Sequence, residues 1–455
     1  MLITNYQMPT TISPSRSAAF DILLRVERTG AYAGELLHAE RVEKLSNVDR
    51  GLATELVMGV LRWRSRLDDA IASASARALH QVDVEVLIAL RLAAYQLQFL
   101  SRIPKHAAIN ESVELVKRAK KRSAAPFANA VLRKIAGEEI GSLSEANADD
   151  PAQHLAREFA HPEWLVRRWV DAFGLEPAAE ICRYDQCVPI TAIRVDTSEI
   201  EHELAREAVE LAPGAIVSSA RIVTAGEITK TRAFREGRVF IQDEASQLVA
   251  ALVGTGSRLL DCCAAPGGKT AALAVRNPTA TIIAAELHRH RAELLRKRVR
   301  AGNVQVINAD VLNLPLQGGF DRVLADVPCS GTGTLARNPE IKWRLTTDDL
   351  DDLHVRQVEI LRAALQQLAP GGRAVYSTCS LEHEENASVV HEVLHVDSSC
   401  ELLDCRDELE RLQAGGELVW KDLDSLVSGK FLRTLPGVQP CDGFFAALME
   451  KQVEH

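Results

Sequence analysis

The sequence predicts an α/β protein whose C-terminal half forms a doubly wound, Rossmann-like parallel sheet. After residue 235, short apolar runs such as "SRLLDCCA", "TIIAAEL" and "FDRVLADVP" alternate with helical stretches. Strands this hydrophobic, separated by helices, are typical of a parallel sheet that is covered on both faces. Residues 15–140 instead carry apolar residues at helical spacing throughout, which predicts an all-α domain in front of the sheet.

The segment between these two regions predicts a third, smaller part. The stretch "GEEIGSLSEANADDPAQ" is polar and acidic, so it marks a linker near residues 137–153. After it come a helix and short β-like pieces, "PITAIRVDT" and "GAIVSSARIVT". We therefore expect a helical domain over 1–140, a small α+β linking domain over 150–234 and the sheet domain over 235–455.

Composition limits the class of protein. With 455 residues, 47% of them hydrophobic, the chain can fill two or three cores. A net charge of -9 argues mildly against nucleic acid as a partner when the charge is averaged over the surface, although local patches can differ. The sequence shows neither a signal-peptide pattern nor a run of 18 apolar residues, so we expect a cytoplasmic protein without a membrane segment. Nine cysteines, unevenly placed, fit free thiols better than a disulfide framework.

The first strand of the sheet domain runs into a glycine-rich turn, "DCCAAPGGKTAALA". Pro266, Gly267 and Gly268 make a tight turn, and Lys269 and Thr270 open a helix, so backbone amides can face a ligand. By itself this pattern also fits an ordinary turn between a strand and a helix. It matches neither the dinucleotide nor the P-loop fingerprint, so it does not require a ligand with phosphates.

Acidic residues follow the next strands. Glu286 ends the second strand nineteen positions after Gly267, which is the distance at which nucleotide-binding domains place an acid for ribose hydroxyls. Asp310 and Asp326 end the third and fourth strands. Each acid alone could be a solvated strand end. Together they would repel a polyphosphate and suit a ligand with a ribose, an adenine and a positive charge, such as S-adenosylmethionine.

Two cysteines follow apolar strands, Cys329 in "DVPCSGTG" and Cys379 in "YSTCSLEHEEN". A single cysteine at such a place is most simply a small buried hydrophobe. A pair suits methylation at carbon 5 of a pyrimidine, where a thiolate must add to carbon 6 before carbon 5 becomes nucleophilic, and a base must later remove the carbon 5 proton. Asp326 precedes Cys329 by three residues and joins the candidate catalytic set. The residues alone do not decide which thiol attacks.

At this point the sequence resembles a known family. The two cysteine motifs, with "LLDCCAAPGGKT", "IQDEASQLVA" and "DGFFAALME", resemble the RNA cytosine-5 methyltransferases. The helical front end, with "RIPKHAAINESVELVK" and "FANAVLRKIA", resembles the NusB-like RNA-binding domain of the bacterial Sun/RsmB branch, which modifies 16S ribosomal RNA. The resemblance runs from about residue 15 to residue 450.

The resemblance implies a class I S-adenosylmethionine-dependent methyltransferase fold and assigns roles to the thiols. It implies that Cys379 attacks the base and that Cys329 helps to release it. Two departures are that the ribose acid is more often Asp than Glu, and that "LPGVQPCDGFF" varies the usual approach to the last strand. The S-adenosylmethionine contacts that it implies are Cys263, Ala264, Ala265, Pro266, Gly267, Gly268, Lys269, Glu286, Asp310 and Asp326.

Two clusters of positive charge are candidate contacts for RNA. The run "KRAKKR" concentrates charge in the helical domain, where phosphates could dock, and "LARNPEIKWR" follows the Pro-Cys motif and could steer a flipped base. A solvated helix face and an ordinary loop are the alternatives. The candidate residues are Lys117, Arg118, Lys120, Lys121, Arg122, Arg337, Lys342 and Arg344.

The sequence shows no spacing that indicates a metal site. His288, His290 and the cysteine pairs at 182/187 and 400/405 lack partners at metal-ligand spacing, so we interpret them as structural. We expect a monomer that binds 16S ribosomal RNA, without a metal. The alternatives are a non-catalytic RNA-binding or ribosome-assembly factor, and the same chemistry on tRNA. An NAD-dependent dehydrogenase would lack its dinucleotide fingerprint and leave both cysteines unexplained.

Overall fold

The computed structural model describes residues 12–137 and 150–453, which form two compact units. The first unit comprises Met1–Val188 together with Leu335–Arg344, and the second comprises Pro189–Thr334 and Leu345–His455. The predicted linking domain at 150–234 is therefore divided. Its helices belong to the first unit, and its strands belong to the second.

The first unit is helical, as predicted for residues 15–140. Its helices are α1 (Pro14–Thr29), α2 (Ala33–Leu37), α3 (Glu40–Glu43), α4 (Asn47–Arg62), α5 (Arg64–Ser75), α6 (Val84–Phe99), α7 (Lys105–Arg118), α8 (Ala125–Gly137), α9 (Pro151–Glu158), α10 (Glu163–Phe173), α11 (Leu175–Asp185) and α17 (Ile341–Arg344). Helix α9 begins at Pro151, inside the stretch 137–153 that was predicted to be a linker, and residues 138–149 of that stretch lie outside the described residues. Asp150 accepts hydrogen bonds from the amides of Ala152 and Gln153, and Pro151 takes the first helical position.

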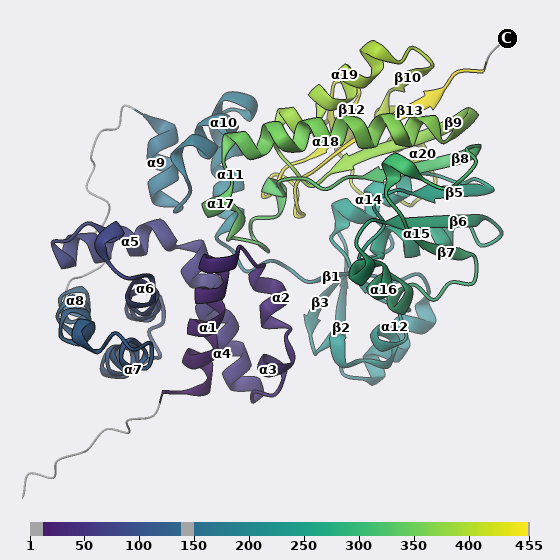
Figure 1. Ribbon diagram of the computed structural model, residues 1–455. Coiled ribbons are helices and arrows are strands. Elements are labelled where there is room, and N and C mark those ends of the chain that lie inside the picture. The colour runs from purple at the N-terminus through teal and green to yellow at the C-terminus, as the bar shows by residue number, and fades with distance from the viewer. Residues whose placement is uncertain (1–11, 138–149, 454–455) are drawn as a thin grey trace, which may run out of the picture. The chain divides into compact units, whose positions relative to one another are not determined.

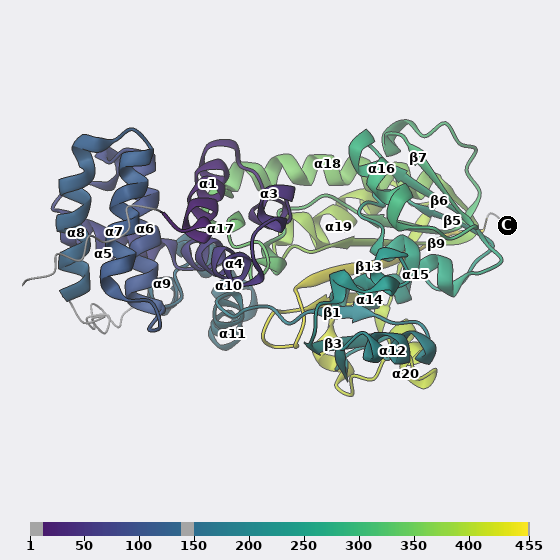
Figure 2. The same cartoon turned by 90° about the horizontal axis from the view of Figure 1, so that it is seen from below.

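Helix α6 is the centre of the helical core. Residues 86–96 are buried on every side of the helix, because α1, α4, α5, α7 and α8 pack around it. Figure 2 shows α5, α6, α7 and α8 side by side. Helix α4 approaches α6 closely at Gly59, where an added Cβ would lie 2.0 Å from the ring of Tyr95. Only glycine fits at this position.

The short segment Leu335–Arg344 leaves the sheet unit and folds with the helices of the first unit. Lys342 donates to the carbonyl of Arg62 at 3.0 Å, and Trp343 donates through Nε1 to the carbonyl of Leu61 at 2.5 Å. In return, Arg62 donates to the carbonyl of Ala336 at 2.9 Å. The carbonyls in the last turn of α4 have no partner within the helix, and the negative end of the helix dipole favours a cation there. The segment thus caps α4.

The ammonium of Lys342 lies inside this unit. Lys342 is only 1% exposed, and this burial lowers the pKa of its side chain to about 7. Asp185 and Cys182 favour its charged form, whereas Arg62 opposes it. Beside it, Nε2 of the buried His161 lies 3.2 Å from a carboxylate oxygen of Asp185, and burial holds the pKa of His161 well below its usual range. The helical core therefore encloses a cluster of titratable side chains.

The second unit is built on a nine-stranded sheet. Its strand order is β11-β12-β13-β9-β8-β5-β6-β7, with β10 paired to β13 (Figure 1). Strands β7, β6, β5, β8 and β9 run parallel to one another, and β13 runs antiparallel to β9. The strands are β5 (Arg258–Asp261), β6 (Thr281–Glu286), β7 (Val304–Asn308), β8 (Phe320–Asp326), β9 (Leu368–Thr378), β10 (Cys400–Leu403), β11 (Val427–Ser428), β12 (Phe431–Thr434) and β13 (Phe444–Lys451).

Helices cover both faces of this sheet, which confirms the predicted doubly wound domain. Neighbouring strand residues alternate between the faces, so Leu259 packs in one core and Leu260 in the other. One face is covered by α14 (Glu244–Leu252), α15 (Gly268–Arg276), α16 (Arg289–Arg298) and α20 (Cys405–Ala414). The opposite face is covered by α18 (Thr347–Gln366) and α19 (Ala387–Val396).

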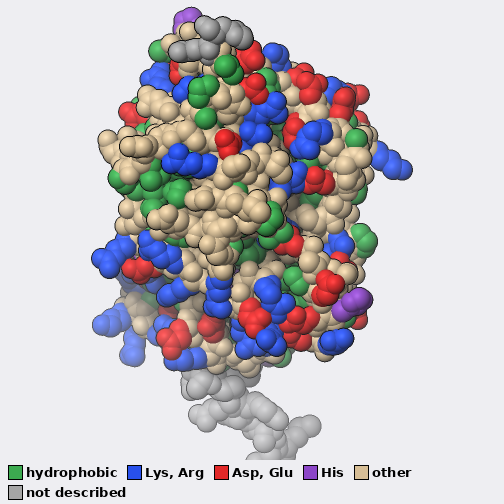
Figure 3. Space-filling model, turned by 90° about the vertical axis from the view of Figure 1, so that its right-hand side faces the viewer, with side chains coloured by type: hydrophobic (Ala, Val, Ile, Leu, Met, Phe, Trp, Pro, Cys, Tyr) green, Lys and Arg blue, Asp and Glu red, His purple; other side chains and the backbone are tan. Residues whose placement is uncertain are grey.

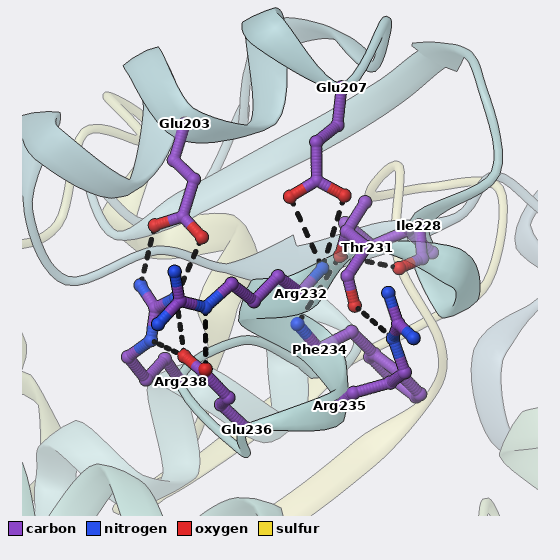
Figure 4. A network of polar contacts seen from close by, with 9 residues as sticks. All are labelled: Glu203, Glu207, Ile228, Thr231, Arg232, Phe234, Arg235, Glu236 and Arg238. Carbon is purple, nitrogen blue, oxygen red and sulfur yellow. Dashed lines mark hydrogen bonds and ion pairs between the residues drawn. The ribbon is translucent and has the colours of Figure 1, made fainter.

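A small antiparallel sheet belongs to the same unit. Its order is β2-β3-β1-β4, and its strands are β1 (Ala192–Arg194), β2 (Glu210–Pro213), β3 (Ala220–Ala225) and β4 (Phe240–Ile241). Helices α12 (Ser198–Arg206) and α13 (Arg232–Arg235) accompany it. Figure 4 shows how Arg238 connects them, because it binds Glu203 on α12 through two nitrogens, at 2.7 and 2.8 Å, and also Glu236. These side chains are partly exposed, so the network contributes only modestly to stability.

Replacing Lys342 by methionine tests the buried ammonium. In the unfolded chain the lysine pKa is about 10.4, well above the folded value of about 7, so between these values the unfolded state binds more protons. The free energy of unfolding then rises with pH by up to about 1.4 kcal/mol per pH unit. Lys342→Met removes this contribution. Urea unfolding followed by tryptophan fluorescence at pH 7, 8 and 9 should show wild type gaining stability relative to the variant.

The exposed Lys117 provides the control, because Lys117→Met should give a constant difference from wild type over the same pH range. A difference between wild type and Lys342→Met that does not change with pH would contradict the burial of a charged group at this position.

Candidate functional site

The two candidate thiols lie next to each other at one edge of the sheet. The sulfur atoms of Cys329 and Cys379 are 3.3 Å apart, and both residues are half-buried. Their loops follow the neighbouring parallel strands β8 and β9, whose register pairs Asp326 with Ser377. Since the carboxyl ends of parallel strands meet at one edge, this register brings the two cysteines together.

The two sulfurs interact directly. The hydrogen bond with Cys379 and burial raise the pKa of the Cys329 thiol well above its usual range, and the negative charge of Glu385 acts in the same direction. Cys329 therefore keeps its proton at neutral pH. A hydrogen bond joins the two sulfurs, and either of them can be its donor.

A close backbone contact fixes the loop that carries Cys329. The amide of Gly333 donates to the carbonyl of Cys379 at 2.9 Å, and the amide of Gly443 donates to the carbonyl of Gly333 at 2.7 Å. An added Cβ at Gly333 would lie 2.2 Å from the carbonyl oxygen of Gly443, so glycine is needed there. The Asp-Gly-Phe-Phe stretch thus supports the thiol loops, although its approach differs from the usual family pattern.

Asp326 lies at the end of β8, close to the glycine turn. Lys269 donates to one of its carboxylate oxygens at 2.8 Å, and Ser377 donates to the other at 2.8 Å. The side chain of Asp326 is still 27% exposed, so a ligand can reach it. The ammonium of Lys269 also lies 4.9 Å from the centre of the Phe444 ring. Lysine and aspartate therefore form a partly exposed ion pair beside the thiol loops.

The glycine turn between β5 and α15 has a backbone that requires glycine. Gly267 has a φ of +109°, and a Cβ there would lie 2.6 Å from Val299. Two arginines hold the turn. Arg291 donates to the carbonyl of Ala265 at 3.0 Å, and Arg194 donates to the carbonyl of Gly268 at 3.2 Å. The sequence analysis missed both arginines, since one belongs to a surface helix and the other to the small sheet.

The other predicted acids lie at the ends of the neighbouring strands. Glu286 is buried and accepts the amide of His288 at 2.9 Å, and Asp310 accepts the amide of Leu312 at 3.0 Å. Strand β5 ends in a further acid, Asp261, that sequence reasoning missed. Burial raises the pKa of Asp261 to about 7, and its carboxylate accepts a hydrogen bond from Thr270 at 2.7 Å. Carboxyl groups thus stand at the ends of β5, β6 and β8 and just after β7.

These residues fit a positively charged ligand that carries ribose hydroxyls. The glycine turn lets backbone approach a ligand without a side chain in between, and Glu286 offers a buried carboxylate for hydroxyl groups. The segment Cys263–Lys269 lies at the same edge, between β5 and α15, with Cys263 and Lys269 half-buried. The site therefore has the donors and acceptors that a nucleoside requires, next to the paired thiols.

The side chains of the predicted RNA contacts differ in how exposed they are. In the first cluster Lys117, Arg118, Lys120 and Arg122 are exposed and Lys121 is half-buried. Acids in the same unit partly balance this charge, because Lys117 pairs with Glu114, Arg118 with Asp21 and Lys121 with Asp83.

In the second cluster the prediction for Lys342 is not supported. Its ammonium is buried and donates to the carbonyl of Arg62, so it is not on a surface that a phosphate can reach. Arg344 is exposed and lies over the ring of Tyr32, 4.2 Å from the ring centre, and Arg337 is half-buried. On the face of the molecule in Figure 3, Lys and Arg side chains are interspersed with Asp and Glu side chains.

The cysteines and histidines that were interpreted as structural are spread over the chain. Cys182, Cys400 and Cys405 are buried and Cys187 is exposed, and the rings of His288 and His290 are 5.9 Å apart. Among the described residues, no group of three or more His, Cys, Asp or Glu side chains could hold a metal ion. Within the same residues, every helix is too short or too polar to cross a membrane.

Comparison with known proteins agrees with both units. Residues 252–450 match the family described as 16S rRNA methyltransferase RsmB/F, and residues 13–137 match the NusB family. A Bacillus subtilis protein named "Probable ribosomal RNA small subunit methyltransferase B" is 35% identical, over 96% of this chain and 98% of its own length. The Vibrio cholerae ribosomal RNA small subunit methyltransferase B is 31% identical, over 96% of this chain and 97% of its own. The crystal structure of PH0851 shares the fold, with a TM-score of 0.78 and 24% identity over 97% of this chain and 99% of that one.

The fold and the site together define a Rossmann-like methyltransferase that is preceded by a NusB-like helical domain. The full-length similarity to curated relatives makes the assignment more specific. The chain belongs to the RsmB/F family of 16S rRNA methyltransferases.

Proposed function

We propose that this protein transfers a methyl group from S-adenosylmethionine to carbon 5 of a cytosine in 16S ribosomal RNA, through a covalent bond between Cys379 and carbon 6 of the base. The observation that carries the proposal is the 3.3 Å separation of the Cys329 and Cys379 sulfurs at the ends of adjacent parallel strands. Methylation at a nitrogen or a hydroxyl oxygen needs no sulfur nucleophile, whereas methylation at carbon 5 needs one sulfur to attack and a base to complete release.

Cys379 is the attacking sulfur in this proposal. Its thiolate adds to carbon 6, and the electron pair of the 5,6 double bond moves to carbon 5, which then bonds to the incoming methyl carbon. Carbon 5 now carries both a methyl group and a proton. When a base takes that proton, the double bond forms again and the bond between carbon 6 and sulfur breaks, which returns Cys379 as a thiolate.

Cys329 is suited to act as the base in the second step. Before attack, its hydrogen bond with Cys379 is the largest cause of its raised pKa, and the charge of Cys379 adds to it. Once the Cys379 sulfur is bonded to carbon 6, it is a thioether without a negative charge. Removal of these two causes lowers the pKa of Cys329, although burial and the charge of Glu385 still raise it. Formation of the adduct therefore makes it easier for Cys329 to release its own proton to solvent, and the resulting thiolate can then accept the carbon 5 proton.

The residues at the strand ends would hold S-adenosylmethionine. Glu286 would accept hydrogen bonds from ribose hydroxyls, Asp310 would lie near the adenine, and the Cys263–Lys269 segment would supply backbone contacts. Asp326 offers a partly exposed carboxylate near the thiols, so it can also contact the base. When bound, S-adenosylmethionine supplies an electrophilic methyl group on a positively charged sulfur, which the acidic strand ends favour.

The NusB-like unit would bind the RNA substrate. The curated relatives are named as methyltransferases of the small-subunit ribosomal RNA, and this name motivates the proposed substrate. Lys117, Arg118, Lys120, Lys121 and Arg122 offer positive charge for phosphates. Arg337 and Arg344 stay in the proposed set for the second cluster, and Lys342 is removed from it.

The proposed reaction can be tested by bisulfite sequencing of 16S ribosomal RNA, because methylated cytosine resists conversion to uracil. RNA from cells that contain this protein should keep a cytosine that is converted in RNA from cells that lack it. If every cytosine of 16S ribosomal RNA is converted in both samples, the proposed substrate is wrong. Loss of a protected cytosine in tRNA alone would move the same chemistry to tRNA.

Substituting each thiol separately should give opposite results. Cys379→Ala should abolish methyl transfer and adduct formation, because no sulfur remains to attack carbon 6. Cys329→Ala should accumulate a protein–RNA adduct that resists SDS, because attack proceeds and release does not. Gel electrophoresis with radiolabelled RNA measures both. Cys187→Ala, which changes an exposed thiol in the helical unit, should behave as wild type.

A change at Glu286 tests the proposed cofactor site. Glu286→Gln should weaken S-adenosylmethionine binding by about tenfold or more, because a hydrogen bond to a charged group contributes about 1.5–3 kcal/mol. Titration calorimetry measures this dissociation constant directly. Glu293→Gln, the same change at an exposed position on α16, should leave the affinity unchanged. Equal affinities for all three proteins would remove Glu286 from the site.

A further inference from the structure

We propose that Glu385 is a positioning residue that holds the two catalytic thiols at a fixed distance from each other without touching the base. This inference rests on the proposed function, since it concerns the two steps assigned to Cys379 and Cys329. Glu385 ends the short 3-10 helix His383–Glu385, six residues after Cys379, and its side chain is 0% exposed. The sequence motif "SLEHEEN" contains three acids and gives no sign that Glu382 and Glu385 are buried while Glu384 is not.

A single carboxylate binds the residue that follows each cysteine. One oxygen of Glu385 accepts the amide of Ser330 at 2.8 Å, and the other accepts the hydroxyls of both Ser330 and Ser380. Ser330 follows Cys329 and Ser380 follows Cys379. The two serine hydroxyls also lie 3.1 Å apart. The Glu385 carboxylate thus connects the loop of one thiol to the loop of the other.

Helix α18 fixes this carboxylate from the other side. The side-chain amide of Gln357 is buried, and it donates to Glu385 at 2.9 Å and to the carbonyl of Pro328 at 2.9 Å. Pro328 immediately precedes Cys329. The positions before and after Cys329 are therefore both attached to the same pair of buried side chains, and that pair is anchored in a long helix.

The backbone around Glu385 is also fixed. Its carbonyl accepts the hydroxyl of Tyr376 on β9 at 2.5 Å, and the side chain of Asn386 donates to the carbonyl of Ser380 at 2.9 Å. A buried carboxylate is strongly destabilising unless it is hydrogen-bonded, and here four donors surround it. These four hydrogen bonds restrain the carboxylate, which suits a group that sets the distance between two reactive atoms.

The two proposed steps depend on this distance to different degrees. Attack needs only the Cys379 sulfur at carbon 6. Release needs Cys329 near the carbon 5 proton while Cys379 is still bonded to the neighbouring carbon, so both sulfurs must fit one base at once. Misplacing a reacting group by about 1 Å can cost about 100-fold in rate. Weakening the Glu385 network should therefore slow release more than attack.

The experiment compares Glu385→Gln with Glu392→Gln. Glutamine at 385 has nearly the same size, but its NH₂ group faces donors and loses at least one of the four contacts. The same change at Glu392 on α19 affects a half-exposed residue that pairs with His354. For Glu385→Gln we expect turnover to fall about 10- to 100-fold while the SDS-resistant fraction of RNA rises, and for Glu392→Gln we expect wild-type values of both.

A second measurement tests the thiol distance without any methyl transfer. Phenylarsine oxide bridges two neighbouring thiols, and peptide mapping shows which cysteines it has joined. It should join Cys329 to Cys379 in wild type and do so several-fold less in Glu385→Gln. This readout needs no RNA, so it still tests the positioning role if the proposed substrate is wrong.

Two results would overturn the inference. Wild-type turnover and wild-type arsenical bridging in Glu385→Gln would show that the carboxylate does not set the distance between the two thiols. A parallel fall in turnover and adduct, together with a lower melting temperature and unchanged bridging, would show a contribution to stability alone. Absence of any adduct and any cytosine methylation in wild type would instead count against the proposed function.

Discussion

The pairing of two parallel strands is the constraint on which the site depends. Strands β8 and β9 lie side by side in register, and each continues at the same sheet edge into a loop that carries a cysteine. The result is a pair of sulfurs 3.3 Å apart, with a half-exposed thiol in each loop. Hydrogen bonds to the Glu385 carboxylate join the two loops, and backbone hydrogen bonds of Gly333 and Gly443 restrain them further. Sheet geometry brings the thiols together, and the buried polar network keeps them there.

The loop that carries Cys329 is followed in the sequence by a segment that belongs to the helical unit. Six residues after Cys329, the chain enters the Leu335–Arg344 segment, which folds with the first unit and caps α4 through Lys342 and Trp343. Lys342 donates a hydrogen bond at the end of a helix, whereas desolvation disfavours its charged form and lowers its pKa. A segment that is next to the Cys329 loop in the sequence therefore contributes to the packing of the NusB-like unit.

Periodicity and strand-end chemistry predicted the helical and doubly wound domains, because apolar spacing and the order of strands and helices are local properties. They also placed Cys329, Cys379 and the strand-end acids at one edge. Burial, and contacts between residues that are far apart in the sequence, could not be predicted from these local patterns. Lys342 follows a polar loop and resembles a surface cation, yet it is enclosed by residues more than 150 positions away. Glu385 and Gln357 meet only in the folded chain, and Arg194 reaches the glycine turn from the small sheet.

In the proposed reaction the sulfur of Cys379 bonds to carbon 6 of the base, and Cys329 then removes the proton from carbon 5. A fragment of 16S ribosomal RNA that contains 5-fluorocytidine tests this reaction most directly, because a fluorine at carbon 5 leaves no proton to remove and the covalent adduct persists. After proteolysis, mass spectrometry identifies the peptide that carries the nucleotide. The account predicts the nucleotide on the peptide with Cys379, in wild type and in Cys329→Ala alike. A nucleotide on Cys329, or an RNA that is methylated elsewhere without any covalent bond, would contradict it.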